Sequence, residues 1–549
     1  MGKSILARGL SKLKREKKKQ QKNTGRQAYV QAVESLPVDP KLVVLEARNG
    51  RAIDGNIYYL LREMVTCPDY EDLKILVVAE NDEAEAAMSR KLKKIPEATG
   101  RVEYVRLSSE AYYRAMATAG SIINDATIGN FFIKRPGQKY LNVWHGTPLK
   151  AMGRRVSHEP HAVGNVQKNF IAADYLLYPN DYMMEHMVED YMIADISPAT
   201  ALMGGYPRNA VFFEEESRQE VRQTITGSSQ VRRIYAYMPT WRPNLMGEEL
   251  QGILEEIDRS LDPDEKMIVN VHPLAEETVS FDGLSRVEPF PEGIENYAAL
   301  GAADALLTDY SSVFYDYAVT RRKIVLLTYD EEEYFATRGL YEPISSLPFP
   351  QAKTVAEAME ALRSPKEYDD TEFMYKYCRY ESADAARLLC RHMLLGETCL
   401  EERPIPGNGL PNILVWGGDL SPGERTDEVM TFLEQADQTK GNYFLTFNRG
   451  DLKERFSILF DLPEGIRFIG RPGKMLLDQE QEEVSRRYKK GKCSFEEYWQ
   501  VTRPAFARER QRYYAGMKID RVIQIPEGRK PCPEATKEEL EFSTYETEE

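Results

Sequence analysis

Residues 73–92 read LKILVVAENDEAEAAMSRKL, and they contain the two patterns that decide the fold. The apolar run Leu73–Val78 is short and rich in β-branched residues, which predicts a buried β-strand. The charged segment Glu83–Leu92 behind it predicts a helix. A strand followed by a helix is the repeating unit of a parallel sheet flanked by helices.

The same alternation continues on both sides of this unit. Further strands are expected at Leu42–Leu45, Val102–Leu107, Ser121–Ile123, Tyr140–Val143 and Tyr175–Tyr178. Helical spacing predicts helices at Ile57–Val65 and Tyr182–Tyr191. This rhythm predicts one Rossmann-like α/β domain, which we place at residues 37–231.

A second Rossmann-like domain is expected at residues 232–403. Its predicted strands are Ile234–Met238, Met267–Val271, Ala303–Thr308 and Ile324–Thr328. A long helix or helix pair at Glu372–Leu395 closes it. Two such domains face each other in this plan, and α/β sheets bind ligands beyond the C-terminal ends of their strands.

A third α/β unit is expected at residues 404–549, after the linker PIPGNGLP. Its predicted strands are Ile413–Trp416, Tyr443–Thr446, Ile466–Ile469 and Arg521–Ile525. Residues 533–549 carry seven Glu and one Lys, which is typical of a solvated acidic tail. This third unit has no partner unit after it.

The composition excludes several classes of protein. Hydrophobic residues make up 42% of the 549, so the chain can bury several cores and is not disordered as a whole. No apolar run approaches the length of about 18 residues that a membrane span needs, and a secretory signal is not indicated. The six Cys are scattered without a CxxC pair, which favours reduced thiols in a cytoplasmic protein over a zinc site or a disulfide framework.

The charge is distributed unevenly along the chain. Residues 1–26 hold ten Lys and Arg against one Glu, a net +9, so the remainder of a chain at −15 stands at −24. Ile5, Leu6, Leu10 and Leu13 give this basic segment an apolar edge, which predicts that residues 1–36 associate with an anionic membrane surface. The alternative is a disordered basic tail. The acidic bulk argues against nucleic acid as a partner.

Two histidines stand where strands end. The heptapeptide WHGTPLK directly follows the strand Tyr140–Val143 and places His145 at its C-terminal end. Histidine can take up a proton near neutral pH, and Gly146 permits a ligand to approach the backbone. His272 follows the strand Met267–Val271 in the same way, at the equivalent end of the second sheet.

Further candidates for phosphate contact lie in the second half of the cleft. Ser311 and Ser312 end a strand and precede a predicted helix at Val313–Val319, an arrangement that offers hydroxyl and backbone donors to phosphate. Arg208 can pair with phosphate oxygens, although an interdomain salt bridge is an equal reading. No metal site is predicted, because Asp262-Pro263-Asp264 is read as a turn.

An ordered set of motifs, spread over roughly residues 40–395, resembles the CDP-glycerol glycerophosphotransferase family of teichoic acid synthesis. The motifs are WHGTPLK, NVQKNF-x3-DYLLYPN, GYPRN, YMPTWR, VHP and LTDYSSVFYDYA. The resemblance implies a GT-B-like fold that binds CDP-glycerol between its two domains. It also implies transfer of glycerol phosphate to a hydroxyl of a lipid-linked acceptor, with release of CMP, at the cytoplasmic face of the membrane and without a further cofactor.

The resemblance also implies roles for residues in these motifs. His145 would be the base for the acceptor hydroxyl, and His272 would contact the diphosphate and stabilise developing charge. Asp316 would bind a donor hydroxyl, and Arg208 would contact the donor. The whole predicted donor site comprises Trp144, Gly146, Thr147, Pro148, Arg208, Pro239, Thr240, Ser311, Ser312 and Asp316.

Other readings stay open from the sequence. A related CDP-ribitol phosphotransferase, a nucleotide-sugar glycosyltransferase and a non-catalytic membrane scaffold for envelope polymer assembly are the rivals. Residues 411–549 resemble the first half of a GT4-type glycosyltransferase and lack the second half, so we expect no sugar transfer from them alone. The formation of a homo-oligomer is also left open.

Overall fold

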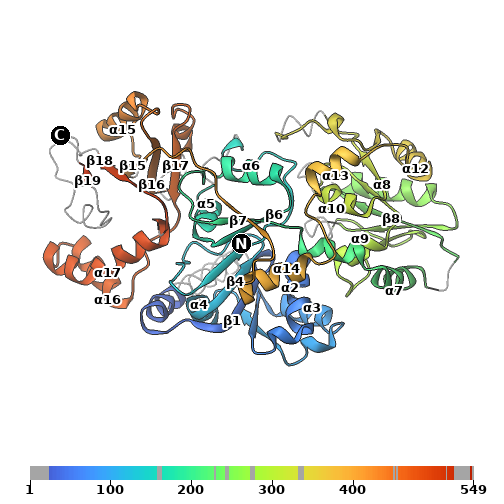
Figure 1. The fold of residues 1–549 in the computed structure, drawn as a ribbon, viewed down its shortest axis with the longest axis horizontal. Coiled ribbons are helices and arrows are strands. Elements are labelled where there is room, and N and C mark those ends of the chain that lie inside the picture. Colours follow the sequence, from blue (N-terminus) through green and yellow to red (C-terminus); the bar gives the residue numbers. More distant parts are fainter. Residues whose placement is uncertain are drawn as a thin grey trace, which may run out of the picture.

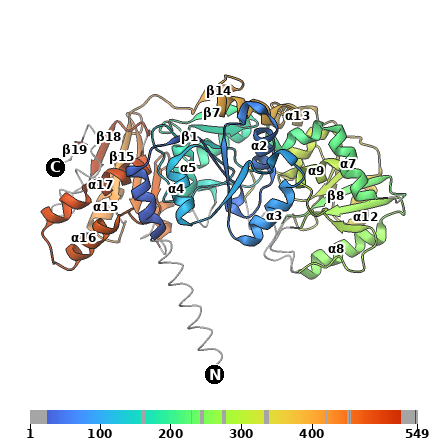
Figure 2. The ribbon, with the colours of Figure 1, turned by 90° about the horizontal axis from the view of Figure 1, so that it is seen from below.

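The computed structural model describes residues 24–156, 163–227, 230–240, 247–271, 278–331, 339–418, 420–448, 452, 455–514, 516–524 and 545–546. Three α/β bodies lie in a row, each built on its own sheet (Figure 1). The body that begins near the N-terminus lies in the middle, with the second body on one side and the C-terminal body on the other (Figures 1 and 2). The predicted GT-B-like pair of α/β domains with an extra unit is confirmed.

The first sheet has eight strands in the order β14-β7-β6-β5-β4-β1-β2-β3. All neighbours are parallel except β14, which runs antiparallel to β7. The strands are β1 (Asp39–Glu46), β2 (Lys74–Ala79), β3 (Val102–Arg106), β4 (Ala119–Asn124), β5 (Lys139–Asn142), β6 (Tyr175–Tyr178), β7 (Thr200–Met203) and β14 (Glu401–Pro404). The helices are α2 (Gly55–Thr66), α3 (Asp82–Leu92), α4 (Glu110–Thr118), α5 (Val163–Ala172), α6 (Asp181–Asp190) and α14 (Ala385–Cys390).

The opening stretch of the sequence shows why these elements form. The side chains of β2 that point into the core, Ile75, Val77 and Val78, are almost completely buried. The chain then turns into α3, where the side chain of Asn81 accepts a hydrogen bond from the backbone N–H of Ala84. This cap satisfies a donor that the first helical turn would otherwise leave unpaired.

The second sheet has six parallel strands in the order β10-β9-β8-β11-β12-β13. They are β8 (Arg233–Met238), β9 (Glu265–Val269), β10 (Val287–Pro289), β11 (Ala305–Thr308), β12 (Lys323–Leu327) and β13 (Gln351–Ala352). Its helices are α7 (Glu215–Thr226), α8 (Gly247–Ser260), α9 (Asn296–Ala302), α10 (Val313–Tyr317), α12 (Val355–Arg363) and α13 (Thr371–Tyr377).

The two domain boundaries lie elsewhere than the sequence predicted. Helix α7, placed by the prediction in the first domain, packs its Val221 and Ile225 into the core of the second. The predicted long helix at Glu372–Leu395 is divided, and α14 packs its Leu389 and Cys390 into the core of the first domain. Amphipathic spacing shows that a helix has a buried face, but it does not show which sheet that face covers.

The third body is docked on the first domain. Its parallel sheet has the order β17-β16-β15-β18-β19, with strands β15 (Asn412–Gly418), β16 (Asn442–Asn448), β17 (Arg467–Arg471), β18 (Arg521–Gln524) and β19 (Tyr545–Glu546). Its helices are α15 (Glu424–Gln435), α16 (Gln479–Lys489) and α17 (Phe495–Tyr514). Gln167 Nε2 donates to the carbonyl of Phe468 at 2.9 Å, and Arg467 pairs with Asp195 at 2.9 Å. Apolar side chains of both bodies form one hydrophobic cluster, so the third unit packs against the first domain.

The predicted membrane segment 1–36 is partly a folded element. Residues 24–35 are helical, and Tyr29 and Val30 are completely buried in the first domain. Residues 1–23, which carry most of the basic charge, lie outside the described residues. Within the described part of the chain, no helix has the length and apolar character to span a bilayer, and no group of His, Cys, Asp or Glu side chains could hold a metal ion.

Two helical glycines provide a test of the docking of the third unit. A Cβ on Gly164 of α5 would lie 2.9 Å from the carbonyl oxygen of Gly470 in β17, whereas a Cβ on Gly252 of α8 would meet nothing within 4 Å. We expect Gly164→Ala to lower the unfolding free energy by about 1–3 kcal/mol through overpacking. The control Gly252→Ala should instead raise it by up to about 1 kcal/mol through helix propensity. Urea unfolding measures both, and equal gains would show that α5 and β17 are not in contact in solution.

Candidate active site

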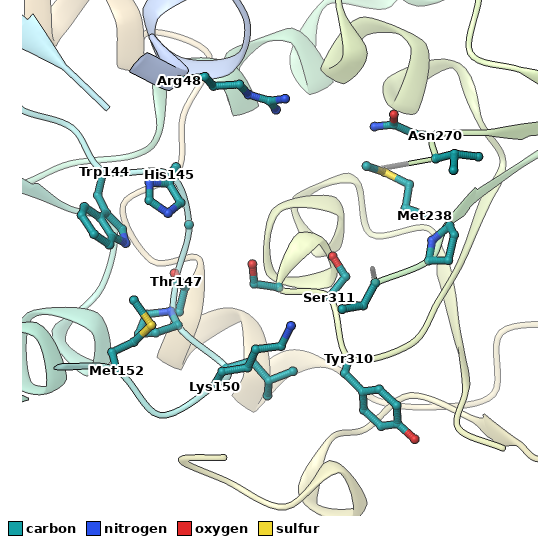
Figure 3. Close-up of a pocket in the computed structure, with 17 residues that line it drawn as sticks. Arg48, Trp144, His145, Thr147, Lys150, Met152, Met238, Asn270, Tyr310 and Ser311 are labelled. Atoms are coloured by element: carbon teal, nitrogen blue, oxygen red, sulfur yellow. The ribbon is translucent and has the colours of Figure 1, made fainter. Parts of the chain in front are cut away.

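A cleft of about 340 Å³ lies between the first and second domains, where the C-terminal ends of strands from both sheets meet. Figure 3 shows Arg48, His145 and Lys150 on the first-domain side, with Met238, Asn270 and Ser311 on the other. The full lining is Arg48, Trp144, His145, Gly146, Thr147, Pro148, Leu149, Lys150, Met152, Met238, Pro239, Thr240, Asn270, Val271, Tyr310, Ser311 and Ser312. This set includes two permanent cations and no carboxylate, so the cleft suits an anionic ligand.

His145 has a fixed orientation at the centre of the first-domain wall. Its Nδ1 lies 2.7 Å from the backbone carbonyl oxygen of Asp125, which follows β4. Because a carbonyl can only accept, Nδ1 carries the proton, and Nε2 of the neutral ring is left with its lone pair. The ring also stacks on Trp144, with centroids 4.3 Å apart and an interplanar angle of 26°. His145 is therefore held as a neutral base whose free nitrogen is Nε2.

The surroundings of His145 keep the ring neutral. The imidazole is open to the cleft, but protein encloses it densely, and this desolvation lowers the pKa of His145 to about 4. The carbonyl of Asp125 opposes the shift, while the charges of Arg208 and Arg48 add to it. A histidine with a lowered pKa stays unprotonated at every pH above that value, so His145 can accept a proton throughout the neutral range.

The loop that carries His145 has an unusual backbone. Trp144 has a φ of 48° and Gly146 a φ of 152°, both in the region that side chains disfavour. A Cβ on residue 146 would also lie 3.2 Å from Ser312 Oγ and 3.5 Å from Arg208 Nη2. Glycine thus allows the second domain to approach the loop closely. Backbone strain of this kind is often found at functional sites.

The second-domain wall comes from the ends of β8, β9 and β11. The backbone N–H of Thr240 donates to both carboxylate oxygens of Asp309 at 2.9 and 3.0 Å, which ties the ends of β8 and β11 together. The hydroxyl of Thr240 has no hydrogen-bond partner among the described residues, and it lines the cleft. Ser311 Oγ accepts from the N–H of Val313 at 3.4 Å. Helix α10 has only five residues, where the sequence predicted seven, so its dipole is small.

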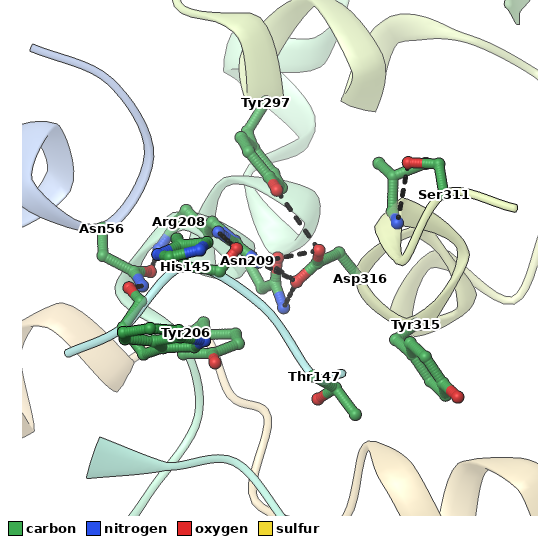
Figure 4. Close-up of polar contacts among 12 residues, drawn as sticks. Asn56, His145, Thr147, Tyr206, Arg208, Asn209, Tyr297, Ser311, Tyr315 and Asp316 are labelled. Carbon is green, nitrogen blue, oxygen red and sulfur yellow. Dashed lines mark hydrogen bonds and ion pairs between the residues drawn. The ribbon is translucent and has the colours of Figure 1, made fainter. Parts of the chain in front are cut away.

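Arg208 and Asp316 are engaged with each other behind the cleft, and neither is among its lining residues. Arg208 Nη2 lies 2.9 Å from Asp316 Oδ2, and Arg208 Nη1 donates to the carbonyl of His145 at 2.9 Å. Asn209 and Tyr297 donate to the same carboxylate at 3.1 and 3.2 Å (Figure 4). Both charged side chains are about 95% buried. The structure thus forms the interdomain salt bridge that was the alternative reading of Arg208, and direct donor contact by either residue stays a prediction.

The remaining predicted site residues divide into two groups. Eight of them line the cleft as a set: Trp144, Gly146, Thr147, Pro148, Pro239, Thr240, Ser311 and Ser312. Thr147 is buried, and its hydroxyl accepts from Asn180 Nδ2 at 3.0 Å. His272 lies outside the described residues, although Asn270 and Val271, immediately before it, line the cleft.

The sequence analysis missed Arg48, Lys150 and Asn270. Arg48 directly follows β1 and has a φ of 47°, and its backbone N–H donates to the carboxylate of Asp125 at 2.8 Å. Asp125 therefore positions both Arg48, through its side chain, and His145, through its carbonyl. A basic residue immediately after a predicted strand was the available signal, by the same rule that singled out His145.

Comparisons with known proteins agree with this geometry. The sequence model of the CDP-glycerol:poly(glycerophosphate) glycerophosphotransferase family matches residues 28–395. A teichoic acid poly(glycerol phosphate) polymerase of Bacillus spizizenii is 26% identical over 386 residues, which cover 65% of this chain and 93% of that one. A polymerase of the same name from Staphylococcus epidermidis is 25% identical over 398 residues, which cover 67% of this chain and 52% of that one. The structure of the wall teichoic acid polymerase TagF superposes with a TM-score of 0.59 at 22% identity, over 71% of this chain and 97% of that one.

The buried ion pair yields a prediction that separates two roles of Asp316. In Asp316→Asn, the charge of Arg208 stays buried without its counter-charge, so we expect a loss of about 3–5 kcal/mol in unfolding free energy. The control Asp384→Asn removes one partner of an exposed pair with Arg387 and should change stability by less than about 1 kcal/mol. Chemical unfolding measures both. An Asp316→Asn protein of unchanged stability but weakened donor binding would assign Asp316 to the ligand instead.

Proposed function

The chain belongs to the CDP-glycerol:poly(glycerophosphate) glycerophosphotransferase family and is a CDP-glycerol transferase, and on this premise we propose how its cleft performs the reaction. The proposal places the donor between the two domains, with its diphosphate near Ser311, Ser312 and Thr240. The observation that carries it is His145, a neutral imidazole with a fixed tautomer that faces a cationic cleft.

In the proposed step, a hydroxyl oxygen of the acceptor attacks the phosphorus that bears the glycerol. A new P–O bond forms there, and the bond from this phosphorus to the bridging oxygen breaks. CMP leaves with the bridging oxygen and its electron pair. The proton of the attacking hydroxyl passes to His145 Nε2. Such a step depends on positioning and charge stabilisation, with no covalent enzyme intermediate.

Charge that develops on the leaving phosphate requires nearby donors and cations. Arg48 and Lys150 supply two cationic side chains on the first-domain side of the cleft. Thr240, Ser311 and Ser312 supply hydroxyls on the opposite side. His272 is proposed to contact the diphosphate, as its position directly after Asn270 and Val271 suggests. We propose no cofactor besides the donor itself.

The proposal is tested by the release of CMP. With a lipid-linked glycerol phosphate acceptor present, CDP-glycerol should yield CMP, and CDP-ribitol should do so much more slowly. His145→Ala should lower kcat by about 10²–10⁴-fold, the contribution of a general base. His186→Ala is a matched control, because His186 stacks on Tyr341 outside the cleft lining and its loss should leave the rate unchanged.

The pH profile of kcat/KM gives a second readout in the same assay. Because the pKa of His145 is lowered to about 4, the acid limb of the profile should lie well below pH 6.5. Equal CMP release from His145→Ala and the unchanged enzyme would remove His145 from the mechanism. Faster turnover of CDP-ribitol would reassign the donor.

The acceptor and the membrane are parts of the proposal that rest on the sequence. We propose an acceptor hydroxyl at the end of a membrane-linked polyol phosphate or glycan, as in teichoic acid or a related envelope polymer. The net +9 of residues 1–26 suits an anionic bilayer surface at the cytoplasmic face, as a peripheral attachment. The described helix 24–35 then joins this basic segment to the folded body.

Removal of residues 2–22 tests the membrane attachment. The truncated chain retains the buried Tyr29 and Val30, so we expect it to fold normally and to lose most of its binding to vesicles that contain phosphatidylglycerol. Cosedimentation with these vesicles measures the binding, with neutral phosphatidylcholine vesicles as the control. Undiminished sedimentation of the truncated chain would place the membrane contact elsewhere.

A further inference from the structure

A second cavity, of about 450 Å³, lies between the first domain and the third unit. It is at the N-terminal ends of β5, β6 and β7, opposite to the strand ends that form the active cleft. Its first-domain wall includes Lys134, Arg135 and Lys168, and its third-unit wall comes from the end of α17 with Gln511, Arg512 and Tyr513. The cavity therefore exists only while the two bodies are docked.

The lining of this cavity is strongly cationic. Four basic side chains line it, and Asp174 is the one carboxylate among its lining residues. Asp174 already serves two partners, because one oxygen pairs with Lys134 and the other accepts from the N–H of Tyr140 at 2.7 Å. A single engaged carboxylate leaves the positive charge of the cavity uncompensated.

Two of the four cations are deeply buried. Lys168 is 4% exposed, and its Nζ donates to the carbonyl of Phe132 at 2.7 Å. Burial and the nearby charge of Arg512 lower the pKa of Lys168 to about 7, against an opposing contribution from Glu509. Like charges that are brought together away from water destabilise each other unless an anion joins them.

Arg512 adds an independent sign of a missing acceptor. Its side chain is fully buried, with Nη1 donating to the carbonyl of Asn130 at 3.2 Å and Nη2 engaged with Glu509 and Tyr513. Its Nε has no hydrogen-bond partner among the described residues. A buried guanidinium donor without an acceptor is costly, and an oxyanion in the cavity would satisfy it.

We propose that this cavity is a phosphate-binding site in which Lys168 of the first domain and Arg512 of the third unit hold one phosphate group, with Lys134 at its mouth. The bound phosphate supplies an acceptor to Arg512 Nε and neutralises the paired cations. Because the two principal ligands come from different bodies, the anion also strengthens the docking of the third unit. The phosphate group can belong to a free phosphomonoester or to the phosphodiester backbone of a polyol phosphate chain.

Hydrogen–deuterium exchange of the full chain reads this site separately from the active cleft. Inorganic phosphate, titrated at constant ionic strength with sodium chloride, should slow exchange in peptides that cover residues 130–140 and 505–514. The concentration dependence of this protection gives a dissociation constant. Removing one charge-assisted contact in Lys168→Met should raise that constant about tenfold or more. Lys440→Met, at an exposed site on the third unit, should leave it unchanged.

The remaining arms identify the phosphate source and guard against misfolding. Lys134→Met, at the more exposed mouth, should weaken binding as well if Lys168→Met fails to fold. Tighter protection by glycerol 3-phosphate assigns the site to phosphomonoesters, and tighter protection by a short poly(glycerol phosphate) assigns it to the polymer chain. Protection by sodium chloride alone, or an equal dissociation constant in Lys168→Met, overturns the proposal.

Discussion

The buried ion pair between Arg208 and Asp316 is the interaction on which the active cleft depends. It joins the short helical segment that follows β7 to helix α10 of the second domain, across the boundary between the two sheets. The same guanidinium donates to the carbonyl of His145. One side chain thus fixes both the relative position of the domains and the loop that carries the proposed base. A buried pair of this kind adds little net stability over an apolar contact, and its value lies in the single arrangement that it permits.

The polar groups around this pair form a connected set. Tyr206 and Tyr297 lie with their rings 4.5 and 4.8 Å from the guanidinium carbon of Arg208, so the cation is enclosed between two aromatic faces. Asp125 extends the set toward the cleft, because its carbonyl holds His145 and its carboxylate holds the backbone of Arg48. The proposed base and an adjacent cation are therefore positioned by groups that do not themselves line the cleft.

Much of this arrangement was predictable from local sequence. The strand that ends at Asn142 and the loop WHGTPLK identified His145, and the rule that ligands bind at strand C-termini placed it in a cleft between two sheets. The pairing of Arg208 with Asp316 was not predictable in the same way, because 108 positions separate the two residues and only the fold brings them together. Helix α10 is shorter than its pattern suggested, since a 3-10 turn at Ala318–Thr320 replaces its last part. Arg48 was missed because a single basic residue after a strand carries no motif.

The antiparallel strand β14 has a consequence for synthesis of the chain on the ribosome. It covers the outer edge of β7, yet the whole second domain lies between the two strands in sequence. At roughly 5–20 residues per second, about 10–40 s pass between the emergence of β7 and that of β14. Throughout this interval, β7 exposes an unpaired edge that can pair with the strands of other nascent chains. The first domain is thus the earliest to begin folding and cannot finish until the second has been made, which makes it the part of the nascent protein that most needs chaperone protection.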